Sequence, residues 1–154
     1  MAERAGATMI IGLLNGPNLN LLGIREPAVY GTTTLDEIVT RCQIVGRELG
    51  AEVRAYQANG EGQLIDQLHA WRGEVAGVVV NAGAYTHTSL ALRDAFSATS
   101  LPFVEVHLSN IYAREPERRH SMLAGASVGM VCGLGAAGYE YALRGLVQAL
   151  RARS

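Results

Sequence analysis

Strand-length apolar runs alternate with amphipathic helical patterns along most of this 154-residue chain. The predicted strands are Met9–Leu14, Val53–Gln57, Val75–Asn81, Phe103–Leu108 and Ser127–Cys132. The predicted helices are Thr34–Leu49, Gln63–Arg72, Thr88–Thr99 and Leu134–Arg153, with a short helix within Arg114–Met122. Such alternation is typical of a parallel sheet with helices on both faces. At this length it predicts a flavodoxin-like, doubly wound α/β fold with a five-stranded sheet of order 2-1-3-4-5.

No linker interrupts this pattern, so we expect a single domain over residues 1–154, with residues 1–7 as a flexible tail that lacks the apolar stretch of a signal peptide. A net charge of −1 gives no reason to expect nucleic acid or a membrane as a partner. Cys42 and Cys132 lie far apart, on a predicted helix and a predicted strand. We interpret both as reduced thiols of a cytoplasmic protein.

All 13 basic residues are Arg, because the chain contains no Lys. A Schiff-base mechanism requires a Lys amine, and a Walker A phosphate loop requires the Lys of its motif, so both are excluded. An Arg side chain stays protonated at working pH values. Any catalytic Arg in this chain is therefore an electrostatic partner and not a proton donor.

The segment Leu13–Gly31 is much longer than the roughly 2–6 residues that join a strand to a helix, and long ordered loops usually carry function. Near its end, Arg25 and Tyr30 lie five residues apart. A guanidinium beside a phenol favours the phenolate, a base suited to removing a proton α to a carbonyl. A packed tyrosine beside a solvated arginine is the alternative interpretation.

Polar side chains also cluster in the sequence where the predicted strands end. After the first, third and fourth strands come Asn18, Arg25, Tyr30, Asn81, His87, His107, Ser109, Arg114 and Arg118. The carboxyl ends of parallel strands meet at one edge of the sheet, where α/β proteins bind their ligands. The sequence therefore predicts an active site at this edge.

Glu105 and His107 are two residues apart on a predicted strand, so their side chains point to the same face. A carboxylate beside an imidazole fixes its tautomer and favours its charged form, which makes His107 a candidate general acid. A strand histidine satisfied by the backbone is the alternative. Arg118, or the backbone N–H groups of Leu108 and Ser109, can bind a carboxylate, and Asn18 can stabilise a developing oxyanion.

Two familiar kinds of site are not supported. The four His residues show no metal-binding spacing and have no Cys nearby, so we expect no metal. The segment Gly133–Gly138 matches a dinucleotide-binding pattern, but the strand and acidic residue that should follow it are missing before the chain ends. We interpret these glycines as allowing close packing of helix on sheet.

Four segments resemble the type II 3-dehydroquinate dehydratases, in order and over almost the whole chain: Leu13–Gly31, Asn81–Ser89, Glu105–Arg114 and Gly133–Tyr139. The resemblance implies a cytoplasmic lyase of the shikimate pathway that converts 3-dehydroquinate to 3-dehydroshikimate without a metal or cofactor. Two positions depart from the family pattern. Gly60 stands where the family usually has His, and Glu117 where an aromatic residue is common.

The resemblance also implies roles for individual residues. Tyr30 would be the base, Arg25 its cationic partner, Asn18 the holder of a water at the enolate, and His107 the acid, supported by Glu105. The substrate-binding residues would be Asn81, His87, Leu108, Ser109 and Arg118, joined by Asp94 from a neighbouring subunit. Trimers assembled into dodecamers would be the oligomeric form.

Two other classes of function remain as alternatives. The first is a non-enzymatic flavodoxin-like binding module. A phospho-receiver of that kind would need an Asp where Asn81 stands and a Lys after the fifth strand, and a flavin carrier would need a hydroxyl-rich loop after the first. The second is a lyase or isomerase for another cyclic hydroxy-keto acid. The residues alone do not separate it from a 3-dehydroquinate dehydratase, because the two would differ only in their substrate.

Overall fold

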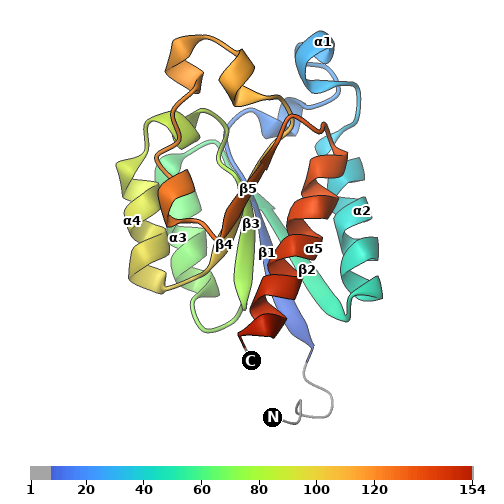
Figure 1. The fold of residues 1–154 in the computed structure, drawn as a ribbon, viewed down its shortest axis with the longest axis vertical. Helices are drawn as coiled ribbons and strands as arrows, with labels where there is room; N and C mark the ends of the chain where they lie inside the picture. The colour runs from blue at the N-terminus through green and yellow to red at the C-terminus, as the bar shows by residue number, and fades with distance from the viewer. Residues whose placement is uncertain (1–7, 154) are drawn as a thin grey trace.

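The predicted fold is confirmed. In the computed structural model, which describes residues 8–153, five parallel strands form one sheet in the order β2-β1-β3-β4-β5 (Figure 1). The strands are β1 (Met9–Asn15), β2 (Ala51–Gln57), β3 (Gly77–Asn81), β4 (Phe103–His107) and β5 (Gly129–Cys132). The helices are α1 (Pro27–Tyr30), α2 (Leu35–Glu48), α3 (Glu61–Trp71), α4 (Leu90–Thr99) and α5 (Ala137–Ala152). The predicted flexible tail, residues 1–7, lies outside the described residues.

The four long helices cover the sheet in pairs. Helices α2 and α5 pack on one face, and α3 and α4 pack on the other (Figure 1). Strand β3 is buried on both faces: Val79 belongs to the core under α2 and α5, whereas Val78 and Val80 belong to the core under α3 and α4. This double burial explains why an uninterrupted run of valines forms the middle of the sheet.

Local signals in the sequence set both ends of α2 close to where they were predicted. The Thr34 hydroxyl accepts a hydrogen bond from the Glu37 N–H at 3.2 Å and so caps α2. Gly50 adopts φ +75° directly after that helix, as a left-handed terminator does. The short helix expected within Arg114–Met122 is a single 3-10 turn, Pro116–Arg118. Among residues 8–153, no helix is long and apolar enough to cross a bilayer.

A close contact between β1 and α3 yields the first prediction. A Cβ added to Gly12 would lie 2.6 Å from Cζ3 of the buried Trp71 ring, so Gly12→Ala overpacks this core. We expect it to lower the free energy of unfolding by about 1–3 kcal/mol. Gly62→Ala is the matched control, since nothing lies within 4 Å of its added Cβ and its place in α3 favours alanine.

Urea unfolding of the two variants measures both effects. Gly62→Ala should raise the midpoint slightly, whereas Gly12→Ala should lower it with little change in m value. A Gly12→Ala protein as stable as the wild type would show that Trp71 is free to move away from the strand.

Candidate active site

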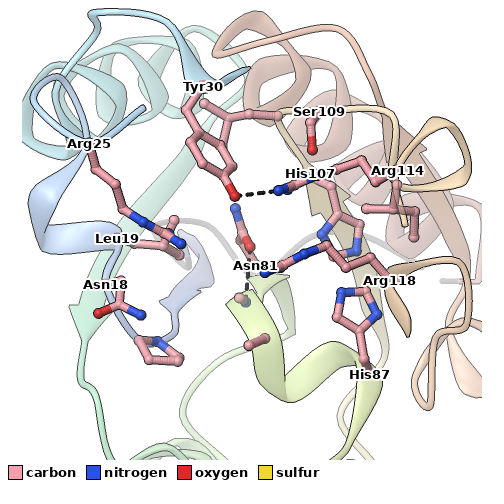
Figure 2. Close-up of a pocket in the computed structure, with 15 residues that line it drawn as sticks. Asn18, Leu19, Arg25, Tyr30, Asn81, His87, His107, Ser109, Arg114 and Arg118 are labelled. Carbon is pink, nitrogen blue, oxygen red and sulfur yellow. Dashed lines mark hydrogen bonds between the residues drawn. The ribbon is translucent and has the colours of Figure 1, made fainter. Parts of the chain in front are cut away.

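A cavity of about 180 Å³ opens at the carboxyl edge of the sheet (Figure 2). The predicted site residues that line it are Asn18, Arg25, Tyr30, Asn81, His87, His107, Leu108, Ser109 and Arg118. Two predicted residues do not line it. Glu105 is fully buried behind His107, and Asp94 lies exposed on α4. Arg114, which the sequence pattern placed at this edge without assigning it a catalytic or binding role, also lines the cavity.

A buried hydrogen-bond network forms the floor of the cavity. Asn15 and Asn81 end the neighbouring strands β1 and β3 and are paired in register. The amide of Asn81 donates to the hydroxyl of Tyr139 at 2.9 Å, and that hydroxyl donates to Asn15 Oδ1 at 2.8 Å. Burial raises the pKa of Tyr139 well above its ordinary value, more than the hydrogen bond from Asn81 lowers it. Tyr139 is therefore a fixed donor and not a candidate base.

The loop after β1 is held against this floor by a second set of polar contacts. The Gly16 N–H donates to the Asn81 carbonyl at 2.8 Å, and a Cβ on Gly16 would lie 2.4 Å from the Ala82 oxygen. Only glycine allows this approach. Asn18 follows at φ +68°, and its N–H donates to Asn59 Oδ1 at 3.0 Å. The loop thus presents Asn18 at the rim of the cavity.

A four-residue helix that the sequence pattern did not predict, α1, carries Tyr30 over the cavity. Pro27 occupies its first turn, where proline's missing N–H costs nothing. Gly31 ends it at φ +80°, with its N–H bonded to the Pro27 carbonyl at 2.8 Å. The loop therefore delivers the phenol on a defined turn and not on an extended strand.

Two guanidinium groups surround Tyr30. Arg114 Nη1 donates to the Tyr30 hydroxyl oxygen at 2.8 Å, while the Arg25 Cζ lies 5.2 Å from the ring centroid (Figure 2). The pairing of Arg25 with Tyr30 expected from the sequence is thus a contact with the ring face, and the direct partner of the oxygen is Arg114. These two residues are 84 positions apart, so spacing gave no signal of the contact.

On the other side of the cavity, Glu105 and His107 make the contact that their spacing predicted. His107 Nε2 and Glu105 Oε2 are 2.7 Å apart, and the Glu105 side chain is fully buried. The second carboxylate oxygen accepts a hydrogen bond from the Ser121 hydroxyl at 2.6 Å. With Nε2 committed to Glu105, Nδ1 is the His107 nitrogen available for proton transfer.

His87 stands beside His107, with 6.5 Å between the ring centroids. Its Nδ1 lies 2.7 Å from the carbonyl oxygen of His120, which selects the tautomer that carries hydrogen on Nδ1. Burial lowers the pKa of His87 below its ordinary value of 6.5, and the nearby His107 and Arg118 act in the same direction. The hydrogen bond to His120 opposes this shift but does not outweigh burial. His87 is therefore neutral at pH 7, with Nε2 as an acceptor.

The remaining polar residues divide between the cavity and its surroundings. Arg118 lines the cavity and pairs with Glu115 on its outer side. The two departures from the family pattern lie away from it: Gly60 caps α3, and Glu117 is exposed on a 3-10 turn. Within the described part of the chain, no group of three or more His, Cys, Asp or Glu is arranged to hold a metal ion.

This fold and cavity define an α/β enzyme with acid–base groups at the carboxyl edge of its sheet. The model of the family described as dehydroquinase class II matches residues 9–147. A 3-dehydroquinate dehydratase of Gemmatimonas aurantiaca is 73% identical over 142 residues, which cover 92% of this chain and 93% of the relative. A 3-dehydroquinate dehydratase of Dinoroseobacter shibae is 57% identical over 138 residues, which cover 90% of this chain and 92% of the relative. The chain belongs to the class II dehydroquinase family.

Solved structures agree with this assignment. The crystal structure of type II dehydroquinase from Propionibacterium acnes superposes with a TM-score of 0.86 at 42% identity, covering 92% of this chain and 99% of that one. The crystal structure of type II dehydroquinase from Butyrivibrio crossotus superposes with a TM-score of 0.87 at 37% identity, covering 95% of this chain and 99% of that one. The flavodoxin-like sheet order is therefore that of the family.

The low pKa of His87 yields the second prediction. Its imidazole should titrate with a midpoint below 6.5 in an NMR titration of the folded protein. Since the unfolded chain then binds the proton more readily than the folded one, the His87 contribution to stability should be complete above pH 6.5 and lost as pH falls from there through the lowered folded-state pKa. A midpoint at or above 6.5 would contradict the neutral acceptor assigned to this residue.

Proposed function

We propose that this protein dehydrates 3-dehydroquinate to 3-dehydroshikimate, as the names of its relatives indicate for them. The reaction is the anti elimination of water from a β-hydroxy ketone through an enolate and is a step of the shikimate pathway. One observation carries the proposal: a phenol between two guanidinium groups and a carboxylate-backed imidazole line the same cavity. Such a cavity supplies a base and an acid to one small molecule.

Tyr30 is the base in this mechanism. The positive charges of Arg114 and Arg25 stabilise its phenolate, because one contacts the oxygen and the other the ring. The phenolate takes the proton α to the ketone, and the electron pair of that C–H bond forms the enolate. Arg114 and Arg25 then remain beside a neutral phenol and an enolate oxygen, so negative charge stays near the cations throughout the step.

Asn18 stabilises the enolate from the loop after β1. Its left-handed conformation and the hydrogen bond from its main-chain N–H to Asn59 fix the backbone that carries its side-chain amide at the rim. An amide N–H, acting directly or through a water, supplies a hydrogen bond where the ketone oxygen gains negative charge.

His107 is the acid that completes the elimination. Glu105 balances the charge of its imidazolium, whose Nδ1–H faces the cavity. As the enolate collapses, the ketone re-forms, a C=C bond appears next to it, and the β-hydroxyl leaves. His107 protonates this hydroxyl, so that it departs as water. The net change is the loss of one water, and solvent resets both side chains.

The other lining residues hold the substrate. Arg118 or the N–H groups of Leu108 and Ser109 bind the substrate carboxylate, while Asn81 and His87 fix its hydroxyls. Asn81 suits this task because its amide is already oriented by Tyr139 and by the Gly83 N–H, which donates to it at 3.1 Å.

The two cysteines are free, which supports a reducing compartment, the cytoplasm.

The wild-type protein should convert 3-dehydroquinate, followed by the ultraviolet absorbance of the enone product. Tyr30→Phe and Arg25→Gln should each lower kcat by about 10²–10⁴-fold while the substrate still binds, since each removes part of the base. Tyr141→Phe, an exposed tyrosine on α5, is the control and should keep full activity. Near-normal turnover by Tyr30→Phe would remove Tyr30 as the base.

We also propose that the protein forms trimers within a dodecamer, in which Asp94 of one subunit reaches the cavity of the next. The exposure of Asp94, away from its own cavity, supports this placement. Light scattering coupled to size exclusion should give a mass of twelve chains. A monomeric protein that is fully active would contradict a shared site.

A further inference from the structure

We infer that Ser121 is a positioning residue for the general acid: it holds Glu105 as a carboxylate and thereby commits His107 Nε2 to one tautomer. This inference rests on the proposed function, in which His107 donates the proton. Ser121 does not line the cavity. Its effect on catalysis must therefore pass through Glu105.

The hydrogen bonds around Ser121 leave only one direction for its proton. Its oxygen accepts the N–H groups of Leu123 at 3.1 Å and Ala124 at 3.0 Å. A hydroxyl has one hydrogen and two lone pairs, so with both lone pairs engaged it must donate to its remaining neighbour. That neighbour is Glu105 Oε1, 2.6 Å away.

The direction of this hydrogen bond affects where the protons of Glu105 and His107 lie. A carboxyl oxygen that carries a proton is a much poorer acceptor than a bare one, so donation from Ser121 favours an Oε1 without hydrogen. The other oxygen faces His107 Nε2 at 2.7 Å. Hydrogen bonds from both partners favour the ionised carboxylate, which then accepts from Nε2–H. Nδ1 is left as the nitrogen that exchanges its proton with the cavity.

Removal of the Ser121 hydroxyl releases this arrangement. Glu105 is fully buried, so loss of the Ser121 hydroxyl leaves Oε1 without the donor that this fold provides. A proton shared between Glu105 and His107 Nε2 would then favour the wrong tautomer, with hydrogen on Nδ1 and no positive charge. The imidazole would keep its place but lose strength as an acid.

Kinetics of four proteins test the idea: the wild type, Ser121→Ala, Ser121→Thr and Ser127→Ala. Ser121→Ala should lower kcat about tenfold or more, the scale of a hydrogen bond to a charged group, with KM within about twofold. Ser121→Thr, which keeps the hydroxyl, should retain most activity. Ser127→Ala is the matched control, because its hydroxyl bonds the Ala124 carbonyl in the same turn without touching Glu105.

Two measurements separate this role from a purely structural one. In a Glu105→Gln background, Ser121→Ala should cost less than twofold, since the residue through which it acts is gone. Nitrogen-15 spectra of His107 should show a protonated Nε2 in the wild type and a shift toward the other tautomer in Ser121→Ala. If Ser121→Ala is too unstable to study, Ser121→Cys keeps the volume, offers only a weak S–H donor and should behave alike.

The inference is overturned if Ser121→Ala keeps kcat within twofold of the wild type. It is also overturned if the loss is as large in the Glu105→Gln background, or if the His107 nitrogen signals do not change. A wild-type protein inactive toward 3-dehydroquinate would refute the proposed function instead. The nitrogen spectra would then still decide whether Ser121 sets the His107 tautomer.

Discussion

The active-site edge depends on one buried hydroxyl. Tyr139 of α5 joins Asn15 and Asn81, the last residues of the neighbouring strands β1 and β3, by hydrogen bonds of 2.8 and 2.9 Å. These contacts orient the Asn81 amide at both ends, since its oxygen also accepts the Gly83 N–H, whereas the Asn15 amide is paired through its oxygen alone. Because Gly16 and Gly83 in turn bond to Asn81, the loops that follow β1 and β3 take their positions from the same point.

The sequence was sufficient to predict the layers of the fold because burial and periodicity are local signals. The run Val78–Val80, flanked by residues of helical spacing, specifies a strand covered on both faces. Helix α1 was not predicted, since four residues are too few to show a helical period. The pair Glu105 and His107 was predictable for the opposite reason: a strand places alternate residues on one face, whatever the rest of the chain does.

Contacts between segments far apart in the sequence could not be predicted from sequence patterns. Arg114 meets the Tyr30 oxygen across 84 residues, and Tyr139 reaches Asn15 across 124. Neither pair has a spacing rule, because the loops that unite them are set by tertiary packing. Asp94 is the extreme case: it does not line the cavity of the described chain, so only resemblance to the family assigned it a role.

The charges around the two candidate proton-transfer groups are opposite in sign, which is why the proposed function assigns them opposite roles. On one side, the guanidinium groups of Arg25 and Arg114 lie against Tyr30, one at its ring and the other at its oxygen. On the other side, the buried carboxyl group of Glu105 lies 2.7 Å from His107 Nε2. Cations stabilise an anionic base, whereas a carboxylate stabilises a cationic acid. This distribution of charge supports the proposed removal of a proton at Tyr30 and protonation of the hydroxyl at His107.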